Sequence, residues 1–203
     1  DGVVDTTEIV DTGTGVYMMH GSPMKDHNWY RGGYQKISLP RILGVSSNIG
    51  VSRIIDEKYA DNPTKFVEGL YRIGIGEPLN LEIPGYQPPI IRYPNKQNWW
   101  KTTLAWMSIG YETQIAPINT LAFYNAIANN GRMVKPRFVK AIMRDGEVIE
   151  EFPVEVLKES ICSSSALKKM QDMLEGVVSK GLGKQASQGD MTLRPTISLH
   201  IGG

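Results

Sequence analysis

Residues 115–128 constrain the fold more than any other segment, because their spacing predicts a helix with apolar side chains on nearly all sides. Thr113 or a neighbouring residue can cap the start of this helix, and Asn129, Asn130 and Gly131 end it. Such a helix is stable in water only where other elements cover it. We therefore predict that it is buried in a packed globular domain.

The composition excludes several classes of protein. The chain has 203 residues, enough for one domain with a hydrophobic core. Its 22 Lys and Arg residues nearly balance 21 Asp and Glu residues, so we expect no nucleic-acid partner. The single cysteine, Cys162, excludes an intrachain disulfide and a cysteine-based zinc site. His20, His27 and His200 are widely separated, so we expect neither a metal nor another cofactor.

Targeting segments are not predicted in this chain. No stretch approaches the roughly 20 apolar residues that span a bilayer. The first residues also lack the basic start and apolar core of a signal peptide.

Short elements are predicted before the apolar helix. The first 36 residues, rich in turn formers, predict a strand or two joined by loops. Ser38 with Pro40 can start one helix, and an apolar set around Ile54 predicts another. We therefore expect residues 44–48 to connect two short helices and to face a concave surface. Asn62 with Pro63 can cap a third helix, and five prolines between residues 77 and 98 predict a long ordered loop.

Three elements are predicted after the apolar helix. Asp145-Gly146, within residues 139–149, is the strongest hairpin signal of the chain, because this pair readily adopts the positive φ angles of a tight turn. Ser163 or Ser164 can cap an amphipathic helix that ends near Gly181. Residues 197–201 alternate between apolar and polar and predict a final strand.

Two short serine patterns could carry chemistry. Ser46-Ser47-Asn48 matches Ser-x-Asn, which arises by chance about once in a few hundred residues. Ser-x-x-Lys occurs at Ser22 to Lys25 and at Ser165 to Lys168. We reject both copies as nucleophiles, because the first lies in a turn-rich segment with Pro23 and the second starts an exposed helix.

The tryptophans are a weaker candidate for a ligand platform. Trp99, Trp100 and Trp106 could stack on a ligand, but paired aromatic residues beside a buried helix more often belong to the core. We interpret all three as core side chains.

Longer blocks around Ser46 resemble a known family. Residues 26–28 (Asp-His-Asn), 33–34 (Gly-Tyr) and 46–51 (Ser-Ser-Asn-Ile-Gly-Val) resemble the segment of class B penicillin-binding proteins that leads into their second active-site motif. Residues 108–111 (Ser-Ile-Gly-Tyr) and 126–131 (Ala-Ile-Ala-Asn-Asn-Gly) are similar to a later stretch of the same family. Matched blocks in the right order and spacing are far more specific than a triplet. The resemblance covers roughly residues 5–186 and points to division-type members.

The resemblance implies an α+β fold of the penicillin-binding transpeptidase and serine β-lactamase type, in which helices flank an antiparallel sheet. We expect this fold to be incomplete in the chain and to consist mostly of the helical lobe. It implies a partial transpeptidase domain over residues 1–203. The helical lobe with the Ser-x-Asn motif spans 37–131, the hairpin and a helix returning to the sheet span 132–186, and 187–203 stay unassigned. The family combines Ser-x-x-Lys, Ser-x-Asn and Lys-Thr-Gly. This sequence matches the second motif alone, so we expect the isolated chain to be inactive.

The activity implied by the resemblance is D,D-transpeptidation, which cross-links peptidoglycan. A serine attacks a D-Ala-D-Ala peptide bond, and the acyl-enzyme then passes its acyl group to an amine of a neighbouring stem peptide. By the same resemblance, Ser46 relays a proton and Asn48 holds the substrate amide backbone. Ser47, otherwise a backbone spacer, and Tyr111 are further candidates for substrate contact.

The implied partners are peptidoglycan stem peptides, β-lactam antibiotics and other cell-wall or division proteins. The implied location is the periplasmic face of the bacterial inner membrane, through an anchor that this chain does not contain. Two alternatives stay open. One is a non-catalytic interaction module of the cell-wall assembly machinery. The other is a related β-lactam hydrolase, for which Glu77, Glu82 and Glu112 offer no preferred water-orienting carboxylate.

Overall fold

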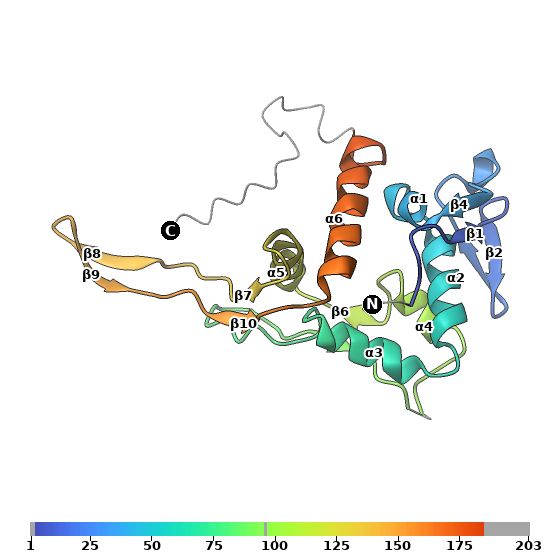
Figure 1. The fold of residues 1–203 in the computed structure, drawn as a ribbon. Helices are drawn as coiled ribbons and strands as arrows, with labels where there is room; N and C mark the ends of the chain where they lie inside the picture. The colour runs from blue at the N-terminus through green and yellow to red at the C-terminus, as the bar shows by residue number, and fades with distance from the viewer. Residues whose placement is uncertain (1–2, 96, 185–203) are drawn as a thin grey trace.

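The computed structural model describes residues 3–95 and 97–184. Helices and short strands follow one another through these ranges (Figure 1). The first half contains β1 (Ile9–Asp11), β2 (Val16–Met19), β3 (Ser22–Lys25), the 3-10 helix η1 (Trp29–Arg31), β4 (Lys36–Ser38), α1 (Leu39–Gly44), α2 (Asn48–Tyr59), α3 (Pro63–Arg72) and β5 (Ile90–Ile91). The second half contains α4 (Thr103–Met107), β6 (Thr113–Gln114), α5 (Pro117–Ala128), β7 (Met133–Val134), β8 (Ala141–Arg144), β9 (Glu147–Glu151), β10 (Val156–Lys158) and α6 (Ser164–Ser179).

The strands confirm the α+β class. Those in the described ranges form five antiparallel pairs, namely β1 with β4, β2 with β3, β5 with β6, β7 with β10, and β8 with β9. Each pair is two-stranded, so no larger sheet is formed within the part of the chain that the structure describes.

Polar side chains cap the starts of three helices in the described ranges, and the sequence predicts two of these caps, Asn62 and Ser163, but not Ser47. Ser38 precedes α1 as predicted but makes no side-chain cap hydrogen bond. The side chain of Ser47 accepts a hydrogen bond from the Gly50 N–H at the start of α2. Asn62 accepts from the Lys65 N–H at the start of α3, and Pro63 occupies its first turn. Ser163 accepts from the Ala166 N–H at the start of α6. Each cap satisfies one of the N–H groups that a helix start leaves without an intrahelical partner.

Four apolar clusters make up the core. The largest joins α5 to α6 and β7 through Ala126, Met133 and Leu167. A second lies beneath the start of α2, where Met19, Met24, Ile49 and Ala105 are all buried. The other two clusters form around Ile42 and around Val67.

The prediction that α5 is buried on all sides is wrong in part. Ala122, Ala126 and Ile127 are buried, but Leu121 and Tyr124 are 62% and 51% exposed. Tertiary packing explains the difference, because the largest apolar cluster contacts one side of α5 and no described element covers the other side. Its start also differs from the Thr113 prediction, since Ala116 is the N-cap residue and Thr113 belongs to β6.

The tryptophans divide between the core and the surface. Trp99 and Trp106 pack against buried clusters, as predicted. Trp100 is 66% exposed, so the prediction of a core position is wrong for this residue. Its backbone N–H donates to the Thr103 hydroxyl where α4 begins, which places the ring beyond the packed cluster.

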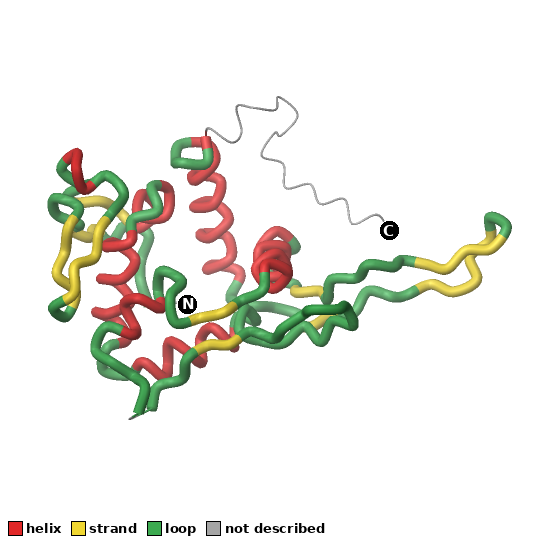
Figure 2. The backbone as a smooth tube through the Cα atoms, turned by 180° about the vertical axis from the view of Figure 1, so that it is seen from behind, coloured by secondary structure: helices red, strands yellow, loops and turns green. Residues whose placement is uncertain are grey.

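The predicted hairpin is confirmed. Asp145 and Gly146, with φ angles of +53° and +85°, join β8 to β9. Figures 1 and 2 show this hairpin projecting from the rest of the molecule. The predicted strand at residues 197–201 lies outside the described residues. None of the helices in the described ranges has the length and apolar composition needed to cross a membrane.

Candidate functional site

The Ser-x-Asn motif lies where α1 ends and α2 begins. The Ser46 N–H donates to the Leu43 carbonyl at 3.1 Å, and the Ser47 N–H donates to the Ile42 carbonyl at 3.0 Å. This pair of bonds is the Schellman pattern, in which the residue after the cap adopts a left-handed conformation. Ser46 holds that position with a φ of +52°. Glycine is usual there, because an L side chain is strained in this conformation, yet Ser46 occupies it with its side chain exposed.

A buried carboxylate anchors the motif from below. Asp26 is fully buried just after β3, and its Oδ2 accepts a 2.8 Å hydrogen bond from the Ser47 hydroxyl. Its Oδ1 accepts from the backbone N–H of Ile49 at 3.0 Å. The Ser47 Oγ in turn accepts from the Gly50 N–H at 3.0 Å. The N-terminus of α2 is thus held by the side chain of Asp26, which follows β3, in the position that the helix dipole favours for a negative group.

The three motif residues have different surroundings. Ser47 is 1% exposed and its hydroxyl is occupied by Asp26 and Gly50, which favours the spacer interpretation over substrate contact. Asn48 is the first residue of α2 rather than part of the connection, and its Nδ2 donates to the Lys25 carbonyl at 3.1 Å. Ser46 lies on the connection, as predicted, and is exposed. Exposure leaves its hydroxyl accessible to a ligand.

The end of α6 packs against the end of α1. The Leu182 N–H donates to the Gly44 carbonyl at 2.9 Å, two residues before Ser46. A Cβ on Gly181 would lie 2.3 Å from the Gly44 oxygen, so only glycine permits this approach without a backbone shift. The end of α6 therefore fixes the position of the turn that carries Ser46.

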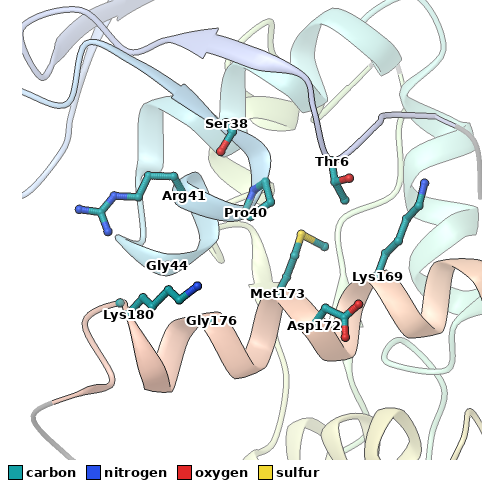
Figure 3. A pocket seen from close by; sticks show the side chains of 11 residues that line it. Thr6, Ser38, Pro40, Arg41, Gly44, Lys169, Asp172, Met173, Gly176 and Lys180 are labelled. Atoms are coloured by element: carbon teal, nitrogen blue, oxygen red, sulfur yellow. The ribbon is translucent and has the colours of Figure 1, made fainter.

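A groove of about 460 Å³ opens between α1 and α6. Figure 3 shows Arg41 and Ser38 on one wall and Met173, Asp172 and Lys180 on the other. Neither Ser46 nor Asn48 lines this groove. Their facing a concave surface stays a prediction.

Neither Ser-x-x-Lys copy has the geometry of a nucleophile with its base. Ser22 and Lys25 lie in strand β3, where residues three apart point to opposite faces. Ser165 and Lys168 are exposed in the first turns of α6. The hydrogen bond from Lys168 to Asp172 raises the pKa of the Lys168 ammonium, the opposite of what a general base needs. Ser165 is also about 21 Å along the helix axis from Ser179, the last residue of α6, at 1.5 Å per residue, whereas the contact with the end of α1 is made just after Ser179.

The remaining candidates lie apart from the motif. Tyr111 is 61% exposed after α4, and its N–H donates to the Trp106 carbonyl. Glu112 pairs with Arg92 at 2.8 Å, and Glu77 lies 4.0 Å from Lys158. Glu82 is exposed. Hydrogen bonds and ion pairs among the described residues connect none of these carboxylates to Ser46. Within the same ranges no cluster of His, Cys, Asp and Glu could hold a metal ion.

Asp26 is the site residue that sequence reasoning missed. It belongs to a block that matched the family, but nothing in its neighbourhood predicts that it is buried beneath a motif 20 residues later. An Asp between Lys25 and His27 has the sequence environment of a surface turn. Its role follows from the packing of β3 against α2, which brings the two segments together.

Comparison with known proteins identifies the relatives of this chain. The family described as "Penicillin binding protein transpeptidase domain" matches residues 1–195. The penicillin-binding protein PbpB of Mycobacterium tuberculosis is 30% identical over 155 residues, which cover 76% of this chain and 22% of that protein. The peptidoglycan D,D-transpeptidase FtsI of Escherichia coli is 29% identical over 130 residues, which cover 64% of this chain and 20% of that protein. The chain thus spans about a fifth of these curated relatives.

Solved structures share the fold. A putative peptidoglycan glycosyltransferase from Atopobium parvulum aligns with a TM-score of 0.70 and 25% identity, over 89% of this chain and 40% of that one. The penicillin-binding protein 3 of Mycobacterium tuberculosis in complex with aztreonam aligns with a TM-score of 0.68 and 23% identity, over 90% of this chain and 39% of that one. The second likeness is evidence of the fold alone.

Proposed function

Because this chain belongs to the penicillin-binding protein transpeptidase domain family, we propose that it is part of a peptidoglycan D,D-transpeptidase that cross-links stem peptides by serine acyl transfer and binds β-lactams. The observation that carries the proposal is Ser46, an exposed serine in a left-handed conformation on a turn anchored from below by Asp26. Residues 37–131 are the helical lobe of the domain. Residues 132–186 contribute the β8–β9 hairpin and helix α6, which returns toward the antiparallel sheet of the complete domain.

Two side chains of the turn take part in the reaction. The Ser46 hydroxyl both donates and accepts hydrogen bonds, so it can relay the proton that moves from the nucleophile to the departing amine. Asn48 uses its Nδ2 to hold the Lys25 carbonyl, and its Oδ1 accepts no hydrogen bond from the described residues. That oxygen can accept from an N–H of the substrate backbone and so hold the scissile bond in register.

Ser47 and Tyr111 have supporting roles. We assign Ser47 to positioning, because its buried hydroxyl fixes Asn48 and Ser46 through Asp26 rather than meeting substrate. The exposed ring of Tyr111 is available for substrate contact after α4, a helix that packs near the start of α2 through Ala105.

The nucleophile comes from outside the described residues of this chain. Acylation needs a nucleophile, a base and an oxyanion hole together, and neither Ser-x-x-Lys pair found here is arranged to provide the first two. The relatives are several times longer than this chain, and their additional length is where we place the nucleophile and the Lys-Thr-Gly strand.

A fluorescent penicillin tests the proposal. The 203-residue chain and a longer protein with all three family motifs are incubated with the probe, separated on a denaturing gel and examined by mass spectrometry. We expect a label on the longer protein and none on the shorter chain. In the longer protein, Ser46→Ala and Asn48→Ala should each slow acylation by about 10²- to 10³-fold, whereas Ser165→Ala should not change it.

Three outcomes would reject parts of this proposal. An adduct on Ser22, Ser46 or Ser165 of the shorter chain would restore a serine that we exclude as nucleophile. Normal acylation by both motif variants would remove Ser46 and Asn48 from the site. A folded longer protein with no label would favour the non-catalytic interaction module.

We also propose a location and partners on the basis of the same membership. We place the whole protein at the periplasmic face of the bacterial inner membrane, where its stem-peptide substrates occur and where other cell-wall or division proteins can reach it. Cell fractionation followed by detection of the protein tests this placement. Recovery in the cytosol would contradict it.

A further inference from the structure

Two cations near the Ser-x-Asn motif have no carboxylate partner. Lys25, the last residue of β3, and Arg31, the last residue of η1, are both exposed. The side chain of neither forms an ion pair with another described residue. Residues 12–36 contain these two cations and Lys36 against one carboxylate, Asp26. Asp26 is fully buried and both of its oxygens already accept hydrogen bonds, so the exposed charge of this segment is positive.

Aromatic rings hold the two cations in place. The Lys25 Nζ lies over the Trp29 ring, 4.4 Å from its centre, and the Arg31 Cζ lies over the Tyr30 ring, 5.2 Å from its centre. The two rings contact each other edge to face with their centres 6.3 Å apart, and they are 47% and 62% exposed. A cation–π contact orients a cation but leaves its N–H groups able to donate. Both cations can therefore bind an anion from solution.

Close backbone packing fixes the turn that carries the rings. A Cβ on Gly33 would lie 2.2 Å from the Gly15 nitrogen, and one on Gly15 would lie 2.7 Å from the Trp29 Cα. Only glycine permits these approaches without a backbone shift. None of the three residues of η1 is buried, so this turn is held by its backbone while its side chains stay at the surface.

The same residues support this turn and the Ser-x-Asn motif. The Asp26 carbonyl accepts from the Trp29 N–H at 3.1 Å, whereas the Asp26 carboxylate holds Ser47 and the start of α2. Asn48 donates its Nδ2 to the Lys25 carbonyl at 3.1 Å. A substrate backbone held by the Oδ1 of that amide would therefore lie beside Lys25, where the positive surface begins.

We propose that Lys25 and Arg31 form a subsite for a carboxylate side chain of the stem peptide, so that the protein prefers a stem peptide with a free carboxylate to the same peptide with a carboxamide. The inference rests on the proposed function, because it takes the stem peptide as the ligand and Asn48 as the residue that holds its backbone. Complementary charge selects this ligand, since two cations without a counter-ion attract an anion. A carboxamide keeps the shape of the group but loses the charge-assisted hydrogen bonds.

Two labelled synthetic peptides test the subsite. Both end in D-Ala-D-Ala, and they differ in one residue, which is Glu in the first and Gln in the second. Their binding to the 203-residue chain is measured by fluorescence anisotropy. We expect the Glu peptide to bind about fivefold more tightly at low salt, and we expect this preference to shrink as salt is added. Binding needs no nucleophile, so this measurement is separate from penicillin labelling.

Charge-neutralising variants locate the carboxylate. Lys25→Gln with Arg31→Gln should bring the affinities for the two peptides within about twofold of each other. The matched control, Lys65→Gln with Arg72→Gln, neutralises two exposed cations of α3 and changes the net charge equally. It should keep the preference for the Glu peptide, because screening weakens charges that lie far from the ligand. Circular dichroism checks that each variant is folded.

The contrary results are equally definite. Failure of both peptides to bind the unchanged chain, or equal binding of the two, would overturn the inference. A preference that survives Lys25→Gln with Arg31→Gln would place the carboxylate elsewhere. Equal losses in the two double variants would show a general effect of charge, which would also overturn the inference. Failure of the proposed function is a different result, because the longer protein would then take no penicillin label whichever peptide the chain prefers.

Discussion

The hydroxyl of Ser47 donates a 2.8 Å hydrogen bond to Oδ2 of Asp26, a carboxylate with no exposed surface. The same hydroxyl oxygen accepts the Gly50 N–H at the start of α2. One side chain thus joins the β3 segment to the helix that follows the motif. The Asp26–Ser47 pair supports the turn that carries the exposed Ser46. These two buried side chains therefore help to position Ser46 although they do not face solvent.

The first prediction concerns this pair. Ser47→Ala should lower the free energy of unfolding by about 2 kcal/mol, because it removes a helix cap and leaves a buried carboxylate oxygen without its donor. Asp26→Asn should cost about 1–3 kcal/mol, because the amide replaces one of two acceptors with a donor. In a double-mutant cycle measured by urea unfolding, the pair should be coupled by about 1 kcal/mol. Additive losses would show that the two residues act independently.

The second prediction separates the effect of Ser46 on the stability of the fold from its effect on penicillin acylation. Ser46→Gly should raise the free energy of unfolding by about 0.5–1 kcal/mol, because glycine adopts the positive φ of this position without strain. In the longer protein the same change should slow penicillin acylation, since the hydroxyl is lost. Ser46→Ala is the control, because it removes the hydroxyl but keeps the Cβ and should give no gain in stability. Destabilisation by glycine would contradict the assignment of strain.

The third prediction concerns the contact between the ends of α1 and α6. Gly181→Ala should lower the free energy of unfolding by about 1–3 kcal/mol, because the added Cβ would lie 2.3 Å from the Gly44 oxygen. Gly176→Ala, in the same helix, meets nothing within 4 Å and should instead stabilise by about 0.5–1 kcal/mol. Urea unfolding measures both. Similar effects of the two changes would mean that the close approach is not important for stability.

The fourth prediction concerns pH and the N-terminal segment. Hydrogen bonds from the backbone N–H and the hydroxyl of Thr7, and then from Lys169, lower the pKa of the Asp5 carboxyl from 3.8 to about 2. A lowered pKa in the folded state means that ionised Asp5 favours folding. This contribution is full above about pH 4 and is lost as the pH falls through about 2.

Carbon-13 NMR of the Asp5 carboxyl measures that titration. The midpoint should lie near 2 in the native chain and should move toward 3.8 when Thr7→Ala removes the hydroxyl donor. Lys169→Ala should also move it toward 3.8, because it removes both a hydrogen bond and the positive charge beside the carboxylate. A native midpoint near 3.8 would show that these hydrogen bonds do not form in solution.

Local sequence patterns were sufficient for much of the fold. The helices that begin after Asn62 and Ser163 start where a polar cap precedes an apolar period, and the hairpin turns at Asp145-Gly146. These features depend on residues a few positions apart, whose hydrogen bonds and φ preferences are the same in any surroundings. The family motif was visible for a related reason, since Ser46, Ser47 and Asn48 are adjacent in the chain.

Tertiary structure decided the features that depend on residues far apart in sequence. The apolar residues of α5 predicted complete burial, but burial depends on which elements lie alongside, and Leu121 and Tyr124 are exposed. Asp26 gave no sign that it supports the motif, because its partner Ser47 is 21 residues away and meets it only after β3 packs against α2. The sequence by itself determined the local turns, the caps and the motif. Only long-range packing decided which side chains lie buried beneath that motif and which remain exposed for a ligand or a partner.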